Sequence, residues 1–530
     1  MENVVKTTEN WTDIIAEKDS LIAEQESQIE QLKSKLSELE ALTKYYEEQL
    51  RLAKHRQFGA SSEKTEIPEQ LGLFDEAENT ADLKKAEPDI ETITYTRRKQ
   101  AGKREDDLSY LPVETVEYSL PEDEGKCPEC GGALHVMGHE IRRELKVIPA
   151  QVKVIEHRRK IYSCRNCEKT EDHTPIVKAP MPEPVIKGSL ASPSAIAHIM
   201  TQKFVMYNPL YRQEQDWLRQ GLSLSRQTMA NWVIRASEDW LEPIYERMRQ
   251  ELLNQEVLHA DETTLQVLRE PGRAARQESY MWLYRTSGDT EHPIVLYEYQ
   301  PTRSSAHPKR FLTGYTGYLH TDGYSGYHTL SGITVVGCFA HLRRKFDEAV
   351  KALPPEKREG SESQKGLELI NELFALEHEF EGLTPEQRKE ARLERSKPKA
   401  EAFFAWAKSL GALPKSALGK AIRYAEEQYP WLMNVYLDGR LELTNNRAER
   451  SIKPFVMGRK NWLFNNTVKG ARASSVIYSI IETAKENGLK PFEYLEFLFE
   501  TMPNTTMGML DKLLPWSPEI PDRCRMSPHA

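Results

Sequence analysis

Three acidic residues occupy positions from which strands and a helix can bring carboxylates to one edge of a sheet. Asp261 lies in a β-type run (HADET), Asp322 closes another (LHTD), and Glu449 sits in the helical segment TNNRAERSIK. Carboxylate oxygens are the hard ligands that magnesium prefers. Two divalent ions held about 3.5–4 Å apart clamp the attacking and leaving oxygens in phosphodiester chemistry. Three such carboxylates at one sheet edge would therefore suit divalent-metal chemistry of the kind that acts on phosphodiesters.

The elements around these carboxylates decide whether they can meet, because 81 acidic residues are present and most are surface groups or helix caps. The β-rich runs near both aspartates follow the order strand, strand, strand, helix, strand, helix, which is typical of a ribonuclease-H-like domain. Thr444 or Asn445 is expected to cap the helix of Glu449. Lys453 and Pro454 should mark its end. Glu449 and Lys453, four residues apart, would share a helix face.

Two CxxC pairs form a second group of potential metal ligands. They are Cys127 with Cys130 and Cys164 with Cys167. Each pair places two thiolates in one tight turn, and two such turns complete a tetrahedral zinc site. The chain contains no signal-like or membrane-spanning apolar run, so we expect a cytoplasmic protein, in which such cysteines favour zinc over disulfides. Free thiols are the alternative, and DNA contact by this zinc-ribbon-like module stays open beside a purely structural role.

Cys338 and His341 make a further Cys–His pair, at a point where a helix should follow a strand. Two ligands make only half a metal site, so we expect a packed cysteine and a histidine near the catalytic cleft. Arg343, Arg344 and Lys345 on the same helix are candidates for phosphate contacts, with a solvated basic face as an equal alternative.

Basic residues cluster around Glu449 although the net charge of the chain is −9. Between positions 442 and 472, seven side chains are positive and two are negative. Such a local stripe can bind DNA phosphates without reading sequence. The candidates for these contacts are Arg450, Lys453, Arg459 and Lys460. Trp462 and Phe464 follow, and we expect burial rather than base stacking for both.

Residues 208–235 have the layout of a helix-turn-helix. A helix ending near Gly221 and a second beginning at Arg226 would place the second helix where it can enter a major groove. Arg226 and Gln227 are residue types that read base edges. The expected small core consists of Leu210, Trp217, Leu218, Leu222, Met229, Trp232 and Val233. A plain helical scaffold is the alternative.

The N-terminal segment 12–58 has an apolar heptad pattern. Its a positions include Ile15, Ile22, Ile29 and Leu36, and its d positions include Leu32 and Leu39. This pattern predicts a coiled coil, most simply in a homodimer, with a higher oligomer as a further possibility. One amphipathic helix packed on its own protein is the alternative.

Several longer motifs resemble those of the insertion-sequence-66 family of bacterial transposases. HADET, LHTDGYSGY, GCFAHLRRKF and LTNNRAERSIKPFVMGRKNWLF carry the resemblance, and HRQFGASSEK, LGLFDEAE, the CxxC pairs, NPLYRQE and LLPW extend it over nearly the whole chain. The resemblance implies that Asp261, Asp322 and Glu449 are a DDE triad that holds Mg²⁺ or Mn²⁺. It also implies DNA as the partner, as element terminal inverted repeats and target DNA, together with accessory proteins of the same element.

The expected architecture is multidomain α+β, with a ribonuclease-H-like catalytic domain that contains a helical insertion. The predicted segments are a coiled coil (12–58), a flexible linker (59–110), a zinc-binding module (111–175), a helix-turn-helix-like region (190–250), the first part of the catalytic domain (251–350), the helical insertion (351–440), the end of the catalytic domain (441–501) and a C-terminal tail (502–530). The insertion accounts for the 127 positions from Asp322 to Glu449, a spacing far longer than in minimal DDE enzymes.

The predicted function is that of a DNA transposase, which cleaves the ends of an insertion element and joins them to target DNA. In this hypothesis Asp261 bridges two magnesium ions, and Asp322 and Glu449 each hold one. A non-catalytic zinc and helix-turn-helix regulator is one alternative, although it has no need of three such carboxylates. A ribonuclease-H-like nuclease without strand transfer and an inactive relic of a transposase are the others.

Overall fold

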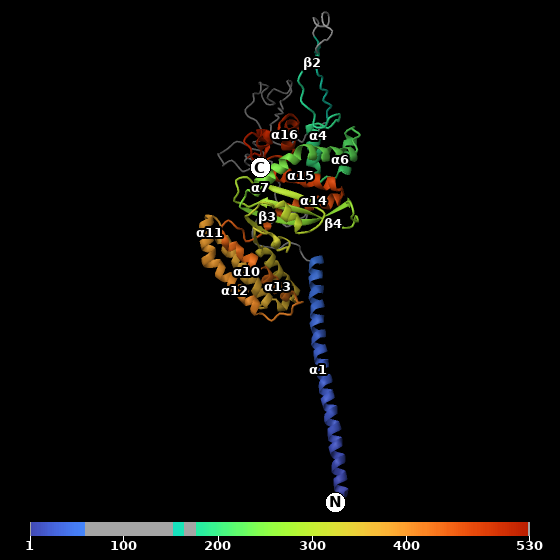
Figure 1. Cartoon of the computed structure of the whole chain (residues 1–530), viewed down its shortest axis with the longest axis vertical. Helices are drawn as coiled ribbons and strands as arrows, with labels where there is room; N and C mark the ends of the chain where they lie inside the picture. The colour runs from blue at the N-terminus through green and yellow to red at the C-terminus, as the bar shows by residue number, and fades with distance from the viewer. Residues whose placement is uncertain (1, 59–151, 164–175, 528–530) are drawn as a thin grey trace, which may run out of the picture.

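The computed structural model describes residues 2–58, 152–163 and 176–527. The predicted linker and the four candidate zinc ligands, Cys127, Cys130, Cys164 and Cys167, lie outside these residues. The described part mixes helices and strands, as the sequence predicts (Figure 1). Among its helices, none combines the length and apolar character that a membrane span requires.

One mixed sheet and the helices around it form the centre of the protein. Its strands are β3 (Val257–Arg269), β4 (Glu278–Thr286), β5 (Val295–Gln300), β6 (Tyr318–His320), β7 (Thr334–Val336) and β8 (Asn465–Thr467), and a separate pair consists of β1 (Ile161–Ser163) and β2 (Ile176–Lys178). The α-helices are α1 (Glu2–Phe58), α4 (Pro193–Phe204), α5 (Leu210–Arg219), α6 (Arg226–Ala236), α7 (Glu242–Leu253), α8 (Ala306–Phe311), α9 (Phe339–Ala352), α10 (Glu362–Glu379), α11 (Pro385–Ala391), α12 (Lys397–Ser409), α13 (Ala417–Leu432), α14 (Asn446–Trp462), α15 (Val468–Glu486) and α16 (Pro491–Thr501).

The strand order of the large sheet is β5-β4-β3-β6-β7, and β8 pairs with the far end of β3. β3, β4 and β5 are antiparallel neighbours, whereas β6 and β7 run parallel to β3. The middle strands are buried on both faces, which explains why they read as continuous apolar runs such as YMWLY and IVLY. Their fully buried side chains include Met281, Trp282, Leu283, Tyr284, Leu296 and Tyr297.

Helix α15 closes the open edge of the sheet beside β5. An edge strand leaves backbone N–H groups unpaired, and burial of those groups without partners costs free energy. Here the N–H of Tyr297 donates to the hydroxyl of Ser479 at 2.8 Å, and that of Val295 to Thr483 at 3.0 Å. The hydroxyls of Ser479 and Thr483 on this largely buried helix thus provide hydrogen-bond partners for the edge strand.

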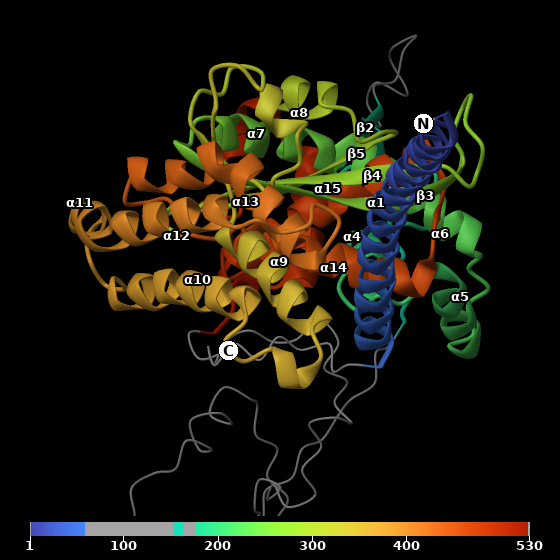
Figure 2. The same cartoon turned by 90° about the horizontal axis from the view of Figure 1, so that it is seen from below.

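Helices α10 to α13 follow α9 in the chain and form a group beside the sheet (Figure 2). This segment corresponds to the predicted insertion. It packs on α9 around a separate apolar cluster that includes Phe346, Ile370, Phe403, Ala421, Ala425 and Leu432. The chain leaves the sheet after β7, builds this cluster and returns to the sheet with α14.

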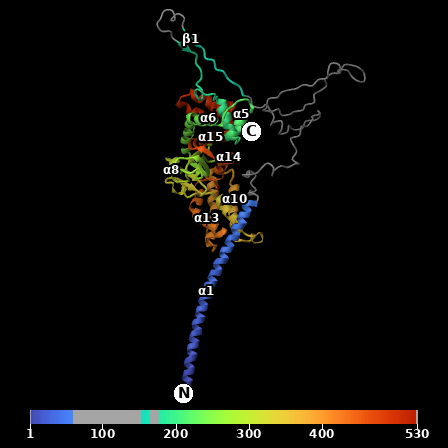
Figure 3. The same ribbon diagram turned by 90° about the vertical axis from the view of Figure 1, so that its right-hand side faces the viewer.

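The N-terminal helix α1 projects from the rest of the protein as a long rod (Figures 1 and 3). It begins at Glu2, before the expected start of the coiled coil at residue 12, because neither proline nor glycine occurs in it. Heptad side chains remain exposed in the single chain: Ile22, Ile29, Leu32, Leu36, Leu39 and Leu50. Such an apolar seam is suited to cover by a second helix.

The other end of α1 is fixed to the group of helices that contains α9 and α13. Arg51 Nε donates to the carbonyl oxygen of Ala352 at 2.6 Å. The carboxylate of Glu48 is buried and accepts from the N–H of Ala417, the first residue of α13, at 2.9 Å. The unpaired N–H groups and positive dipole end of α13 compensate the buried charge of Glu48.

Helix α14 differs from its predicted extent, because it continues through Pro454 to Trp462. The prediction that Lys453 and Pro454 end the helix is wrong. Proline removes one backbone hydrogen bond and costs about 3 kcal/mol in a helix interior. Ile452 and Phe455, on either side of the proline, are buried, and their burial offsets that cost.

Two expectations about single apolar side chains are also wrong. In the α5–α6 hairpin, Trp217, Met229, Trp232 and Val233 are buried, and Leu210 and Leu222 pack against the core. Leu218, however, is 58% exposed, because it follows the inward-facing Trp217 by one residue and so lies on another face of α5. Phe464 is 42% exposed in the turn after α14, whereas Trp462 packs against the core as expected.

Candidate active site

The register of two parallel strands brings Asp261 and Asp322 to equivalent positions. His259 on β3 is the partner of His320 on β6. Each histidine is followed two residues later by one of the aspartates. Since parallel neighbours run in the same direction, both carboxylates lie just beyond the paired histidines.

The turn that presents Asp322 requires glycine at the next position. Gly323 has φ +93, a conformation that other residues rarely adopt. A Cβ there would lie 2.9 Å from Gln428 Oε1 and 3.0 Å from the hydroxyl of Tyr424. Helix α13 therefore limits the side chain at this position and holds the end of β6 in place.

Asn445 connects the start of the Glu449 helix to the same strand. Its side chain is fully buried, and Nδ2 donates to the carbonyl oxygen of Ala260 at 2.8 Å. Its Oδ1 lies 2.9 Å from Nδ1 of His259, and its own N–H donates to Sγ of Cys338 at 3.2 Å. The side chain and backbone of Asn445 thus join β3, the start of α9 and the start of α14, and Glu449 follows one turn later.

The charges of neighbouring carboxylates act on Asp261. Burial raises the pKa of Asp261 well above its usual value, and the negative charges of Glu262, Asp322 and Glu449 raise it further. The N–H of Glu262, which donates to Oδ1 of Asp261 at 2.8 Å, acts in the opposite direction. The structure therefore brings the three predicted acidic residues into one neighbourhood, in which no cation of the described residues contributes to the pKa shift at Asp261.

Glu262, the neighbour of Asp261, has a different environment. Its side chain is 1% exposed, and it accepts from Arg303 Nε at 2.7 Å and from the hydroxyl of Tyr327 at 2.7 Å. Arg303 also lies 4.0 Å from Asp322 and stacks on the ring of Tyr324 at 4.1 Å. Glu262 is thus engaged in structural contacts.

Sequence reasoning did not identify Arg303 or Tyr327. Arg303 stands in a loop after β5 without any motif around it. Only the family-like run GYSGY pointed toward Tyr327.

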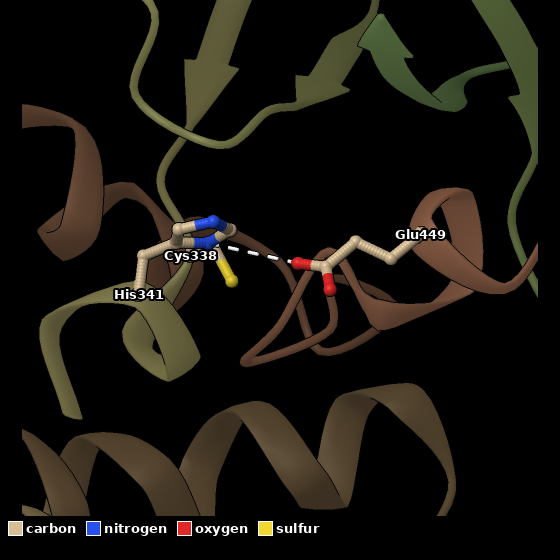
Figure 4. A group of neighbouring side chains, drawn as sticks. All are labelled: Cys338, His341 and Glu449. Atoms are coloured by element: carbon tan, nitrogen blue, oxygen red, sulfur yellow. Dashed lines mark ion pairs between the residues drawn. The ribbon is translucent and has the colours of Figure 1, made fainter. Parts of the chain in front are cut away.

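Cys338, His341 and Glu449 form a second group at the same place (Figure 4). One ligand atom from each lies within 4.8 Å of the others, and His341 Nδ1 is 3.7 Å from Glu449 Oε1. Burial raises the pKa of Cys338 to about 11 and lowers that of His341, and the charge of Glu449 opposes the second shift. Cys338 is buried and His341 lies beside Glu449, as expected, but Glu449 adds a third donor atom that the spacing along the chain could not reveal.

The predicted phosphate-binding residues separate into different places. Arg344 lies 3.8 Å from Glu449, at the carboxylates. Arg343 instead donates to Asn371 of α10 at 2.7 Å. Arg459 does not lie beside Glu449, because α14 is longer than expected; it donates to the hydroxyls of Thr263 and Thr264 at 3.3 and 3.1 Å. Arg450 and Lys460 are exposed on α14, and Lys453 is half-buried.

Arg226 and Gln227 are exposed in the first turn of α6, which Ser225 caps by accepting from the N–H of Thr228 at 3.1 Å. The N–H of Arg226 donates to Glu214 at 2.8 Å, and its guanidinium lies 5.6 Å from the ring centre of Tyr211. In the part of the chain that the structure describes, no hydrogen bond, ion pair or ring contact links these two residues to the three carboxylates. They form a separate surface.

An open depression of about 560 Å³ adjoins Asp322. His328 stacks on Trp431 at its wall, with ring centres 3.4 Å apart. Its lining consists of Arg303, Asp322, Gly323, Tyr324, Ser325, His328, Glu427, Gln428 and Trp431. It offers a flat aromatic wall and one guanidinium directly next to a candidate metal ligand.

Comparison with family models gives four matches in chain order. Residues 188–473 match the model described as Transposase IS66 family, and residues 479–516 match the IS66 C-terminal element. Residues 124–168 match the zinc-finger binding domain of transposase IS66, and residues 45–116 match Transposase C of IS166 homeodomain.

Relatives in Sinorhizobium fredii cover most of the chain. "Uncharacterized protein y4jD" is 32% identical over 454 residues, which are 81% of this chain and 85% of the relative. "Uncharacterized protein y4qI" is 30% identical over 497 residues, 88% of each chain.

Proposed function

Because the chain belongs to the IS66 family of transposases, we propose that Asp261, Asp322 and Glu449 are the metal ligands with which it cleaves and joins DNA. The observation that carries the proposal is the convergence of the three carboxylates. They come from β3, from the turn after β6 and from α14. The charges of Asp322 and Glu449 both raise the pKa of Asp261. Among the described residues no ion pair involves Asp261, and a cluster of carboxylates around such a group is suited to bind a divalent metal.

The sheet supports a ribonuclease-H-like catalytic core. Three antiparallel strands, β3 to β5, are followed by two strands parallel to β3, and the candidate ligands lie on the central strand and its parallel neighbour. We assign this core to residues 251–350 and 441–501, with the helices of 351–440 inserted between them. Both parts contribute to the site, so the chain must return from the insertion to the sheet with Glu449 beside the two aspartates.

The donors fit magnesium or manganese. All three are carboxylates, which hard divalent cations prefer. Among the described residues, Asp261 accepts only the N–H of Glu262, and the buried Oε1 of Glu449 has no hydrogen-bond partner. Magnesium bound here would supply the charge that polarises a phosphodiester and stabilises its transition state.

Two arginines at the site would hold the phosphate of the substrate. Arg344 lies beside Glu449 and Arg303 beside Asp322, and a guanidinium binds phosphate oxygens in bidentate fashion. Arg450 and Lys453 on α14 would extend this contact along the DNA backbone. Since phosphate contacts carry no sequence information, they orient the strand without selecting it.

Selection of the element ends would then fall to other parts of the chain. Arg226 and Gln227 at the start of α6 are exposed where a recognition helix meets base edges. Cys127, Cys130, Cys164 and Cys167 would hold zinc in the segment that matches the zinc-finger model. The exposed seam of α1 would pair two chains, so that two element ends are held together.

A cleavage assay on labelled element ends tests the proposal. Wild-type protein with magnesium should nick the end and transfer it to a plasmid target. Asp261→Asn, Asp322→Asn and Glu449→Gln should each bind the end but lose cleavage by at least about a thousandfold, the size of effect expected when transition-state stabilisation is removed. Glu493→Gln on α16, the same change outside the site, should cleave normally.

The outcomes separate the competing functions. Cleavage without strand-transfer products would indicate a nuclease, and binding without cleavage by wild-type protein would indicate a regulator. Retained cleavage in Asp261→Asn would overturn the assignment of the metal ligands.

A further inference from the structure

Cys338 and His341 lie at the N-terminal end of α9, with their side chains directed toward Glu449 on α14 (Figure 4). Cys338 immediately precedes the helix and is 1% exposed. His341 lies in the first turn. The sulfur, imidazole nitrogen and carboxylate oxygen are all within 4.8 Å of one another, so three donors converge from two elements that are distant in the chain.

Two of these donor atoms are buried and, within the described part of the chain, lack a hydrogen-bond partner, although their side chains are partly exposed. Among the described residues, His341 Nδ1 and Glu449 Oε1 both lack a hydrogen bond, although they lie only 3.7 Å apart. Buried polar atoms are nearly always paired, and each unpaired one costs about 1–3 kcal/mol. When the imidazole of His341 carries its hydrogen on Nε2, Nδ1 and the carboxylate oxygen are both acceptors, and no hydrogen bond can form between them. A cation between them would satisfy both.

The donor types indicate which cation this is. Thiolate, imidazole and carboxylate together are typical ligands of zinc, and magnesium avoids sulfur. Three protein donors also match the number found in zinc sites that keep one position open. The spacing of three positions between Cys338 and His341 at one helix start places both donors on the same side.

We propose that Cys338, His341 and Glu449 form a zinc site that is distinct from the magnesium set and shares one ligand with it. The consequence for activity rests on the proposed function, in which Glu449 holds magnesium. Zinc bound to Cys338 and His341 also binds Glu449. Glu449 then no longer holds magnesium together with Asp261 and Asp322, and cleavage is inhibited. On binding, the thiol of Cys338 releases its proton to solvent and its sulfur forms the bond to zinc, so one proton leaves for each zinc bound.

Cobalt(II) is the probe for this site, because a cobalt–thiolate bond produces a near-ultraviolet charge-transfer band. The full-length protein is stripped of metal, supplied with one equivalent of zinc for the zinc-finger segment and titrated with Co²⁺. The difference spectrum between wild type and Cys338→Ser isolates one thiolate from the other cysteines. We expect one additional Co²⁺ in wild type and no such band in Cys338→Ser.

Further variants test the remaining donors and the fold. His341→Asn and Glu449→Gln should weaken Co²⁺ binding by more than about a hundredfold, since loss of a ligand exceeds the effect of losing its outer-sphere support. Cys524→Ser replaces the other buried free cysteine of the described residues and should leave the titration unchanged. His341 and Glu449 are both partly exposed, so their variants test the site even if Cys338→Ser unfolds.

Inhibition is measured as the ratio of cleavage rates with and without micromolar zinc in magnesium buffer, within each variant. The fold inhibition by zinc should be at least ten times larger for wild type than for Cys338→Ser. Identical Co²⁺ spectra for wild type and Cys338→Ser would overturn the site. Co²⁺ binding needs no DNA, so it is independent of the proposed function. If Glu449→Gln cleaves DNA but fails to bind Co²⁺, the proposed function fails and the zinc site stands.

Discussion

Oδ1 of Asn445 lies 2.9 Å from Nδ1 of His259, at the point where the Glu449 helix meets the Asp261 strand. Nδ2 of the same amide donates to Ala260, so Oδ1 must be the acceptor and His259 must carry its hydrogen on Nδ1. Burial lowers the pKa of His259 to about 3, which keeps the ring neutral. His320 stacks on it with ring centres 4.4 Å apart. A neutral imidazole and one amide thus fix the spacing between two candidate metal ligands.

Asn445→Ala should therefore damage both stability and activity. Ala260 and His259 each lose their partner inside the protein, at a cost of about 1–3 kcal/mol for each group left unsatisfied. Urea unfolding measures this loss. A magnesium titration of cleavage measures the displacement of Glu449 as a higher magnesium concentration needed for half-maximal activity. Asn446→Ala is the matched control, since the hydrogen bond described for Asn446 uses its backbone N–H. An equal effect of both substitutions would contradict the role of Asn445.

Asp261→Asn should abolish cleavage and yet stabilise the metal-free protein. Burial and three neighbouring carboxylates raise the pKa of Asp261, so the folded state binds a proton more tightly than the unfolded state does. Stability therefore falls as the pH rises from the unfolded pKa to the higher folded pKa. The amide removes this loss, and the gain at neutral pH should be on the order of 1 kcal/mol.

The measurement for Asp261 is thermal unfolding between pH 4 and pH 8 without divalent metal. The difference in melting temperature between Asp261→Asn and wild type should grow with pH. Magnesium should reduce it by stabilising wild type alone. A difference that is independent of pH would exclude an elevated pKa at Asp261.

The local sequence indicated which acidic residues come together better than it indicated what surrounds them. HADET could be recognised as part of a strand from its β-type surroundings, and LHTD as the end of a strand from the glycine that follows it. The contact of Asn445 with His259 joins residues 186 positions apart, and no local pattern reports such a contact. Pro454 misled the prediction for the same reason. Its cost is local, whereas the burial of Phe455 that offsets it depends on the sheet.

Arg303→Ala should lower the free energy of unfolding, because Glu262 loses its cationic partner. Glu262 is buried, and without the guanidinium it keeps only the hydroxyl of Tyr327. We expect a loss of about 1–3 kcal/mol, and the double variant with Glu262→Gln should recover most of it. Urea unfolding of the two single variants and the double variant gives the coupling energy. A value near zero would show that the pair contributes nothing.

Arg226→Ala and Gln227→Ala should reduce discrimination between element ends and random DNA. Each lost base contact should cost about 1–3 kcal/mol on the element end and little on random sequence. Lys453→Ala should weaken both complexes equally and lower the salt dependence by about one phosphate contact. Fluorescence anisotropy at several salt concentrations measures both effects. Arg235→Ala, at the opposite end of α6, is the control. Equal losses of affinity for the element end and for random DNA would indicate that α5 and α6 are a structural scaffold and do not read sequence.

Ile29→Glu combined with Leu36→Glu should separate the chains if α1 forms a coiled coil. Both residues occupy a positions and are exposed in the single chain, so a partner helix would bury them and could not accommodate two charges. Light scattering after size exclusion should then give the monomer mass of 61.1 kDa, against twice that value for wild type. Gln31→Glu with Ser34→Glu adds the same charge on the outer face and should leave the dimer intact. If the control dissociates equally, or if wild type is already a monomer, α1 is not the dimer interface.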